Sequence, residues 1–427
     1  MPSETKPATV PAPASAPQSA PAAPPVNTRR LGAHYIGIHG IYWANVAAQS
    51  VYAVVILQSR GFSSVLIGMI IAARAGTSVV MQPQIASFVD KIKQRIPIKY
   101  FNLALIVLAF AANLILLFSG SSLALAFLAF ALFGCTENVL AALNDALAIQ
   151  YINGGYSLNY SLARGTGSLV FAIVCLPLAW LVRNYGNDTV LIAHGVLLVM
   201  EFLIVLPFRN YPGPAAGASE RIRPTTGRQK SYWKIITGSV PLMVYLVSST
   251  GIYMANNTIY QYMVNILTNV GGRKEDVGLA MFIQVACQFP MSLIYGRVVK
   301  YFGVRRLLVF SYFIMVVRQV LLNIAWSPTA VMGFLLIELI AGSIMIPSEV
   351  FYINQVVDPD DVVKGQSLIR IVPSGLGLML ASLIGGSLLD TFGTPGLLRF
   401  SLTTASTGFV IMAAYLAIQA RRNRVGA

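Results

Sequence analysis

Charged side chains inside long apolar segments are the residues of this sequence most able to do chemistry. Arg164 lies in the segment 159–168, which otherwise has the composition of a lipid-soluble helix. A guanidinium at that depth costs on the order of 2.5–3.5 kcal/mol by insertion scales, so it normally faces a water-filled cavity or a carboxylate. The glycines beside Arg164 allow a neighbouring helix to approach closely. We therefore expect Arg164 to line a functional cavity.

Two carboxylates of the fourth apolar segment are candidate partners of Arg164. Glu137 and Asn144 are seven residues apart, as are Asn138 and Asp145, so each pair lies on one face of a helix. We predict that Asp145 or Glu137 forms an ion pair with Arg164, and that Asn144 contributes to the same site. Such a pair satisfies both charges and presents several hydrogen bonds to a polar solute. A purely structural ion pair between helices is the alternative interpretation.

A second group of charges lies on the ninth and tenth apolar segments. Glu338 and Glu349 are eleven residues apart, about three helical turns, so both lie on one face. Arg318 is the expected partner of Glu338. A buried carboxyl opposed by a movable arginine can bind and release a proton as its access changes. We predict that Glu338 and Arg318 couple transport to protons, with Glu349 and Glu137 as further acids; the alternative is a pair that only joins two helices.

A polar face runs along the seventh apolar segment, because Tyr253, Asn257 and Gln261 recur every four residues. Phenol and amide groups both donate and accept hydrogen bonds, which suits a hydroxyl-rich or otherwise neutral polar ligand. We expect these three residues to line a cavity. Hydrogen bonds between helices are the alternative role for the amides.

The first apolar segment carries a smaller polar face. Asn45 and Gln49 share this face, and Trp43 lies on a neighbouring turn. We expect Asn45 and Gln49 to contact the solute. The ring of Trp43 either stacks on the apolar face of a sugar or serves only in packing.

Arg74 and Arg370 are two further cations in apolar segments, and the sequence identifies no partner for either. If they face the cavity together with Arg164 and Arg318, the site is net positive. An organic anion then becomes a candidate substrate.

The composition decides the class of protein. Of the 427 residues, 56% are hydrophobic and only 11% are charged, whereas soluble proteins carry about 25% charged residues. Apolar spans of about 20 residues recur along nearly the whole chain, which indicates an all-α polytopic protein of the lipid bilayer. The net charge is +15, but the basic residues gather in alternate connections, as the positive-inside rule requires. We expect a multi-pass protein of the cell (inner) membrane with both termini cytoplasmic, and no binding of nucleic acid.

Twelve transmembrane helices are predicted, in two six-helix halves divided by a polar, basic stretch that contains prolines. The predicted spans are 34–58, 64–89, 98–119, 121–151, 158–182, 188–209, 235–267, 275–300, 304–326, 328–357, 363–390 and 394–420. The predicted domains are a disordered cytoplasmic tail (1–32), an N-terminal six-helix bundle (33–209), a central cytoplasmic linker (210–231), a C-terminal six-helix bundle (232–420) and a cytoplasmic tail (421–427).

The ends of the second and eighth spans repeat one another. The loop residues that carry the repeat are Asp90, Lys91 and Arg95 in the first half and Gly296, Gly303 and Arg305 in the second. Both copies resemble the short cytoplasmic loop signature of the major facilitator superfamily. The resemblance implies the fold of that superfamily, in which two six-helix halves give alternating access to a central site.

The chain also resembles the oligosaccharide–proton symporter (lactose permease-like) branch of that superfamily. The matching stretches are 68–91, 160–167 and 314–318. The resemblance implies that Arg164 binds sugar and that Asp145 lies near the place of a sugar-binding glutamate. It also implies that Arg318 belongs to the proton-coupling network and that Glu338 takes the place of the coupling histidine.

The chain departs from the pattern of this branch at three places. Val285 and Ala341 stand where the branch has carboxylates, and Asn257 replaces an acid of the seventh helix. The resemblance therefore supports the fold and a symporter-like cavity more strongly than it supports one particular sugar.

These residues together predict a secondary active transporter. We expect a monomer that takes up a small polar solute, such as a sugar or oligosaccharide, together with protons by alternating access. The alternatives are an organic-anion importer and a proton-driven exporter of drugs or metabolites. The sequence contains no Walker loop and no nucleophile–base arrangement, so we expect neither an enzyme nor a cofactor. The three cysteines lack paired spacing, so we expect no metal site.

Overall fold

The computed structural model describes residues 27–92, 95–213, 231–358 and 361–425, and these residues form helices joined by short turns. Most of the predicted N-terminal tail, most of the central linker and the last two residues lie outside the described part. Within the described part there is no strand, so the all-α prediction is confirmed.

Two sets of helices follow one another along the chain. The first set is α1 (Thr28–Val51), α2 (Ala53–Ser59), α3 (Ser64–Ile92), α4 (Ile98–Phe118), α5 (Leu123–Asn153), α6 (Tyr160–Tyr185) and α7 (Thr189–Val205). The second set is α8 (Tyr232–Gly238), α9 (Val240–Gln261), α10 (Met263–Asn269), α11 (Asp276–Ala286), α12 (Gln288–Phe302), α13 (Val304–Asn323), α14 (Pro328–Leu335), a 3₁₀ segment (Leu336–Leu339), α15 (Ala341–Val356), α16 (Val362–Ile369), a π-helical segment (Arg370–Leu376) and α17 (Gly377–Val425).

Helices cover all twelve predicted spans. By length and composition, eight described helices could cross a membrane, or nine if α8 and α9 count as one bent span; α7 and α11 are shorter apolar helices. The segment Lys364–Arg422 holds the last two predicted spans, because Gly393, with φ +63°, breaks α17 between them.

Three helix ends differ from the prediction by five residues or more. The first helix begins at Thr28 because Asn27 caps it, its side-chain oxygen accepting from the Arg30 amide at 3.0 Å. The seventh span begins at Val240, since α8 lies at 102° to α9 and Ser239 caps the new helix. The last helix runs to Val425 instead of ending at residue 420.

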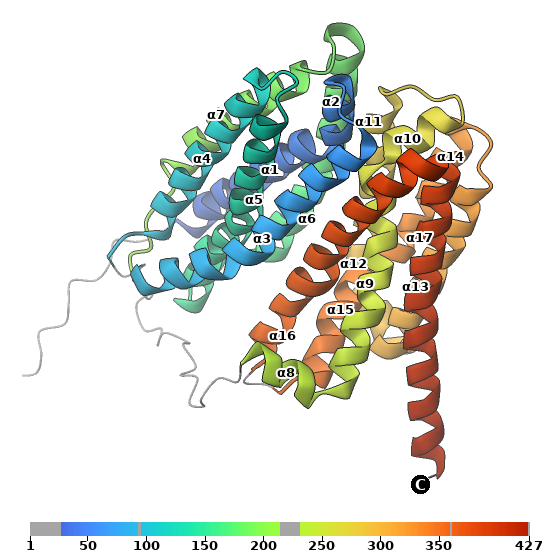
Figure 1. Cartoon of the computed structure of the whole chain (residues 1–427). Helices are drawn as coiled ribbons and strands as arrows, with labels where there is room; N and C mark the ends of the chain where they lie inside the picture. Colours follow the sequence, from blue (N-terminus) through green and yellow to red (C-terminus); the bar gives the residue numbers. More distant parts are fainter. Residues whose placement is uncertain (1–26, 93–94, 214–230, 359–360, 426–427) are drawn as a thin grey trace, which may run out of the picture.

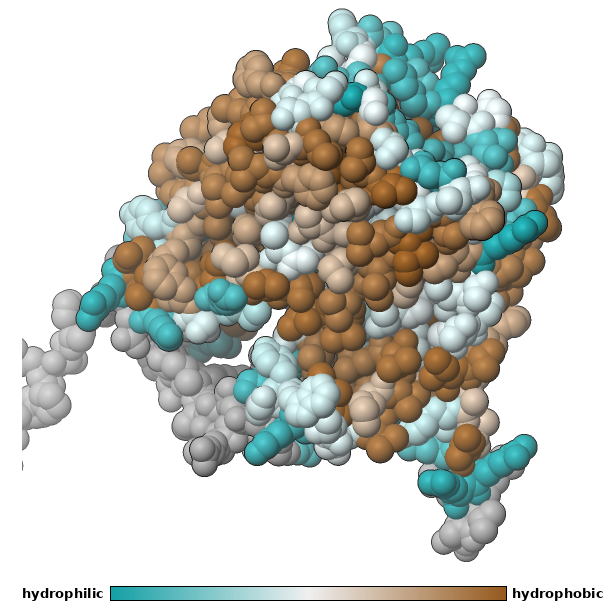
Figure 2. Space-filling view, in the orientation of Figure 1, coloured by the Kyte–Doolittle hydropathy of each residue, from teal (hydrophilic) through white to brown (hydrophobic). Residues whose placement is uncertain are grey.

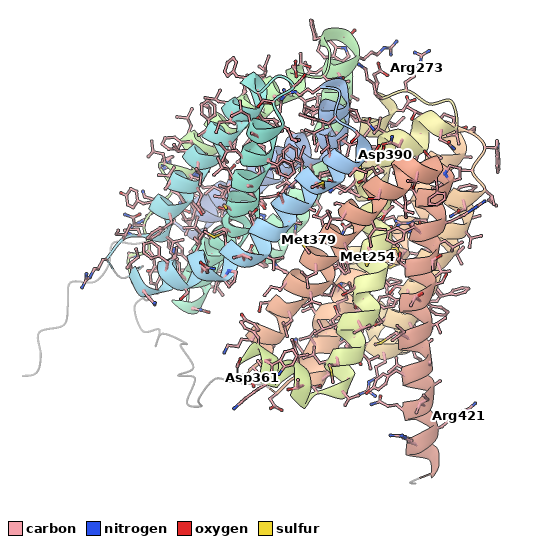
Figure 3. All side chains as sticks on the ribbon, viewed as in Figure 1. Met254, Arg273, Asp361, Met379, Asp390 and Arg421 are labelled. Atoms are coloured by element: carbon pink, nitrogen blue, oxygen red, sulfur yellow. The ribbon has the colours of Figure 1, made fainter. Side chains whose placement is uncertain are left out.

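The two sets form two bundles that lie side by side (Figure 1). They meet at the end that carries Arg273 and diverge toward the end that carries Arg421 (Figure 3). The space-filling view shows an apolar outer surface and a hollow between the bundles at the Arg421 end (Figure 2). Apolar residues such as Ile192, Leu203 and Val410 are more than half exposed on this surface, as expected for side chains that face lipid.

Contacts between the halves close the Arg273 end. The carboxylate of Asp390, in α17 just before the break at Gly393, accepts from the backbone amides of Ser64 at 3.1 Å and Val65 at 3.0 Å, at the start of α3. The amide of Gln58 donates to Asn265 at 3.1 Å, again from one half to the other. The largest apolar cluster also joins residues of both halves. A site between the bundles is therefore open toward the Arg421 end and closed at the Arg273 end.

Candidate functional site

Arg164 and Trp43 form a stacked pair between α1 and α6. The guanidinium of Arg164 lies over the Trp43 ring, 4.4 Å from its centroid. Asn159 caps α6 one turn earlier, its side chain accepting from the Leu162 amide at 2.9 Å. Gly167 lets the ring pack closely against α6, because a Cβ at this position would be only 2.9 Å from Trp43 Nε1 and 3.0 Å from Cγ. A cation over an indole face is a stabilising arrangement.

Asp145 joins groups from both halves. His39 Nε2 lies 3.3 Å from Asp145 Oδ1, and Arg370 Nη2 lies 3.8 Å from Oδ2. Arg164 interacts with Asp145 electrostatically, but no ion pair within 4 Å joins these two described residues. The prediction of a direct pair between Arg164 and Asp145 is therefore wrong, although the two lie in one cluster.

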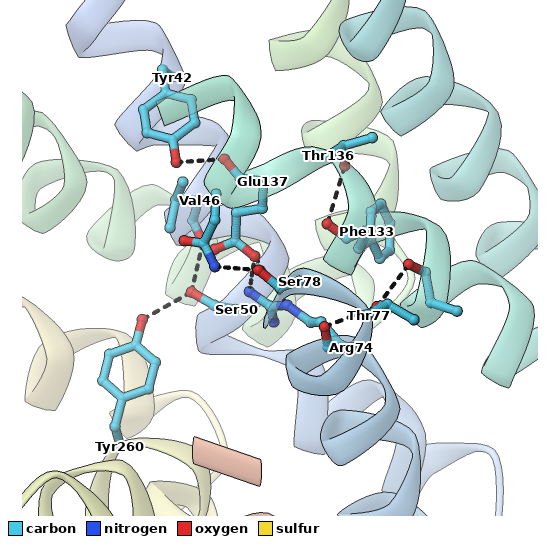
Figure 4. A network of polar contacts seen from close by, with 12 residues as sticks. Tyr42, Val46, Ser50, Arg74, Thr77, Ser78, Phe133, Thr136, Glu137 and Tyr260 are labelled. Carbon is cyan, nitrogen blue, oxygen red and sulfur yellow. Dashed lines mark hydrogen bonds and ion pairs between the residues drawn. The ribbon is translucent and has the colours of Figure 1, made fainter. Parts of the chain in front are cut away.

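Glu137 pairs with Arg74 instead of Arg164. Arg74 donates to Glu137 Oε2 through Nε, at 3.0 Å, and through Nη2 (Figure 4). The physical reason is that α3 packs directly against α5, which brings Arg74 to this carboxylate. Nearby, the hydroxyls of Ser50 and Tyr260 are 2.8 Å apart and join the two halves (Figure 4). The sequence had identified no partner for Arg74.

Arg370 faces the space between the halves. It begins the π-helical segment, which contains Pro373, and its side chain is 49% exposed while reaching toward Asp145 of the other half. Short π-helical stretches inside α-helices occur often at functional sites. The sequence alone identifies no partner for Arg370.

The predicted pair of Arg318 and Glu338 is confirmed as a contact. Arg318 Nη1 donates to Glu338 Oε2, Arg318 Nη2 donates to Asn256 Oδ1 at 2.9 Å, and Gln288 Nε2 donates to Glu338 Oε1 at 3.3 Å. Both charged side chains are almost fully buried. Glu338 lies in the 3₁₀ segment Leu336–Leu339, which interrupts the helix, and such interruptions often mark hinges.

The polar face of α9 divides between two environments. Tyr253 donates to Glu349 Oε2 at 2.9 Å, so its hydroxyl already has a partner. The Asn257 Nδ2 and Gln261 Oε1 atoms are buried and make no hydrogen bond to any residue that the structure describes. A buried polar atom without a partner is costly, so these two amides are available to a ligand.

Three predicted solute contacts lie elsewhere. Asn45 donates to Glu201 Oε2 at 2.7 Å, and Gln49 lines the same small cavity between α1, α5 and α7. Asn144 is fully buried and accepts from Asn102 at 2.9 Å. These side chains face into the first bundle because α7 and α4 pack on that side of α1 and α5. The prediction that Asn45, Gln49 and Asn144 contact a solute in a central site is therefore wrong for this structure.

Glu201 is the residue that sequence reasoning missed. It lies in α7 with no exposed surface. An acid inside an apolar span was a sufficient signal, since the same cost argument singled out Arg164.

The loop residues of the internal repeat are only partly described. The side chain of Asp90 lies outside the described part, and Lys91 and Arg95 are exposed. Gly303 ends α12 with φ +77°, while the space beside Gly296 is open. Arg305 donates to Gln419 Oε1 at 3.4 Å.

The family model described as "MFS_1 like family" matches residues 33–400. The chain belongs to this family. It is a transporter of the major facilitator superfamily, not an enzyme, as the resemblance predicted. A maltose permease of Geobacillus stearothermophilus is 23% identical over 381 residues, which are 87% of this chain and 91% of that protein.

Two solved structures have the same fold. The nucleoside transporter NupG superposes with a TM-score of 0.74 at 12% identity, covering 91% of this chain and 98% of that chain. A bacterial homolog of the human lysosomal transporter Spinster, in an inward-facing and unoccupied conformation, superposes with a TM-score of 0.64 at 12% identity, covering 92% and 95%. At these identities the likeness establishes the all-α polytopic fold and nothing about substrate.

Proposed function

We propose that this MFS_1-like transporter is a symporter that takes up a sugar or oligosaccharide together with protons by alternating access. The observation that carries the proposal is the cluster of Trp43, Arg164 and Asp145 at the open side of the contact between the halves. We also propose that the protein is a monomer of the cell membrane, with the Arg421 end in the cytoplasm, because basic residues are concentrated in the loops at that end.

The cluster has the chemistry of a sugar site. The Trp43 ring offers apolar surface beside Arg164 for a pyranose, and Arg164 and Asp145 offer charged donors and acceptors for neighbouring hydroxyls. From the other half, the unpartnered Asn257 and Gln261 supply neutral hydrogen-bonding groups. The similarity to a maltose permease supports a sugar as the first solute to test.

The pair of Arg318 and Glu338 supports proton coupling. Protonation of Glu338 would remove its charge and leave Arg318 held by Asn256 alone, so the two protonation states favour different helix positions. The 3₁₀ segment around Glu338 supplies the place where the backbone can adjust.

An organic anion is the second candidate solute. Arg164 and the half-exposed Arg370 face a single carboxylate, Asp145, so this cluster carries an excess of positive charge. A carboxylate or phosphate on the solute would complete the pairing.

Proton coupling and both candidate solutes are tested in de-energised cells that overproduce the protein. The cells are kept in weakly buffered medium, and the external pH is recorded. Maltose, other sugars, nucleosides and organic anions are added one at a time, and cells that produce the Arg164→Ala variant serve as the control. Alkalinisation with a sugar supports the proposal. A response to anions alone supports an organic anion, the second candidate, as the solute. Silence with every solute contradicts proton-coupled uptake and favours an exporter.

A further inference from the structure

Glu201 is a buried acid that has no opposite charge beside it among the described residues. No described lysine, arginine or histidine lies within ion-pair distance of its carboxyl, whereas Glu137 and Glu338 are paired with Arg74 and Arg318. An ionised carboxylate isolated in a membrane bundle is strongly destabilising unless a positive charge accompanies it. Glu201 therefore needs a cation that no described residue supplies.

A small cavity lies beside this carboxyl. The polar residues of its lining are Tyr42, Asn45, Gln49, Thr136, Glu137, His194 and Glu201. Its volume is about 20 Å³, which is enough for one occupant of the size of a water molecule. The cavity lies between α1, α5 and α7, within the first half and apart from the pair of Arg318 and Glu338.

Two oxygen atoms at the cavity have no hydrogen-bond donor in the described part of the chain. Asn45 Nδ2 donates to Glu201 Oε2 at 2.7 Å, but Glu201 Oε1 and Asn45 Oδ1 are both buried and unpartnered. Asn144 lies close enough to interact with the carboxyl, yet its Nδ2 also makes no hydrogen bond within 3.5 Å. Carboxylate and amide oxygens are the ligands that hard cations prefer.

Three other polar groups at the cavity have described partners, and Gln49 is a neutral amide. Tyr42 donates to the backbone oxygen of Glu137 at 3.0 Å, and the Glu137 carboxylate is held by Arg74. His194 Nδ1 lies 2.9 Å from Asn113 Oδ1 on α4, and no ion pair within 4 Å joins the described residues His194 and Glu201. Thus none of them neutralises the Glu201 carboxylate.

We propose that Glu201 and Asn45 bind one monovalent cation, either Na⁺ or a proton on the carboxyl, inside the first half of the transporter. The site does not depend on the proposed sugar or on coupling through Glu338. It adds a second place at which a cation binds to the protein.

Thermal unfolding of the purified full-length protein tests the site. In the sodium arm, NaCl replaces choline chloride at constant ionic strength, and the melting temperature is followed as Na⁺ increases. If Na⁺ is the occupant, the wild-type melting temperature rises and saturates, because a ligand of the folded state stabilises it. Glu201→Gln removes the rise, and Asn45→Ala weakens the apparent Na⁺ affinity at least about tenfold, equivalent to about 1.4 kcal/mol.

In the proton arm, choline chloride is kept constant while the pH is raised from about 6 to about 9. If a proton is the occupant, the wild-type protein loses stability as the proton leaves, and Glu201→Gln is less sensitive because it cannot ionise. Asp188→Asn is the matched control, since it removes an exposed carboxylate beside the same helix and should respond as the wild type does.

Equal responses of the wild type and Glu201→Gln in both arms would overturn the proposal and leave water as the occupant. If Glu201→Gln does not fold, Asn45→Ala decides the question, because it keeps the carboxyl and removes the second ligand. Neither arm contains a solute, so failure here is separate from failure of the proposed transport function.

Discussion

Substitution of Gly167 by alanine should weaken solute binding without any change at a charged residue. The new Cβ would lie 2.9 Å from Trp43 Nε1 and 3.0 Å from Cγ, whereas an ordinary contact is 3.4–4 Å. The indole must therefore move away from α6, and it takes with it the face on which Arg164 lies, 4.4 Å from the ring centroid. A desolvated cation–π contact is worth about 2 kcal/mol. If the displaced ring and guanidinium lose about 1.4 kcal/mol of their contact with the solute, the affinity falls about tenfold.

The assay is uptake of the solute that the external-pH panel identifies, with maltose tested first. We expect KM to rise about tenfold in Gly167→Ala, with a drop in melting temperature that reflects overpacking of about 1–3 kcal/mol. Gly40→Ala is the matched control. It adds the same methyl group at the same contact between α1 and α6, but its Cβ would lie 3.5 Å from Val170, an ordinary contact.

One result would refute the role of Trp43 in solute binding. If Gly167→Ala and Gly40→Ala have the same KM while only Gly167→Ala is less stable, the indole has moved and binding has not responded. Trp43 would then be a packing residue and the stacked pair would not belong to the solute site.

Three further substitutions test other parts of the mechanism. Arg164→Ala should abolish accumulation while the protein still inserts, and Arg183→Ala, an exposed arginine near the other end of α6, should not; normal uptake by Arg164→Ala would remove Arg164 from the site. Glu338→Gln should prevent uphill accumulation but spare exchange of solute, and a variant that still concentrates solute would disprove the coupling role. Asp390→Ala removes two backbone contacts that cap α3, worth about 0.5–1 kcal/mol at an exposed site. The equilibrium between the two conformations should shift roughly two- to fivefold toward a state open at the Arg273 end. Nitroxide labels on Ser121 and Thr329 report this shift as a longer distance between the labels. An unchanged distance distribution would contradict the prediction.

The cost of charge in lipid made several site residues visible in the sequence. Arg164, Arg318 and Glu338 stand out because each interrupts an apolar span, and Arg318 and Glu338 pair as predicted. Glu201 satisfied the same criterion and was overlooked. The helical fold was equally accessible, since long apolar spans and their spacing follow directly from the thickness of a bilayer.

The sequence by itself determined the class of protein, the helical spans and the charges that must be satisfied inside the membrane. Only the tertiary structure decided which charges meet. Arg74 pairs with Glu137 because α3 packs on α5, and Asn45 donates a hydrogen bond to Glu201 because α7 packs on α1. In a membrane bundle both the lipid-facing and the core-facing sides of a helix are apolar, so periodicity says little about how the helix is rotated or which neighbour it meets. The rotation of each helix and the neighbour that it packs against depend on contacts between distant segments, and together they determine which residues form the site.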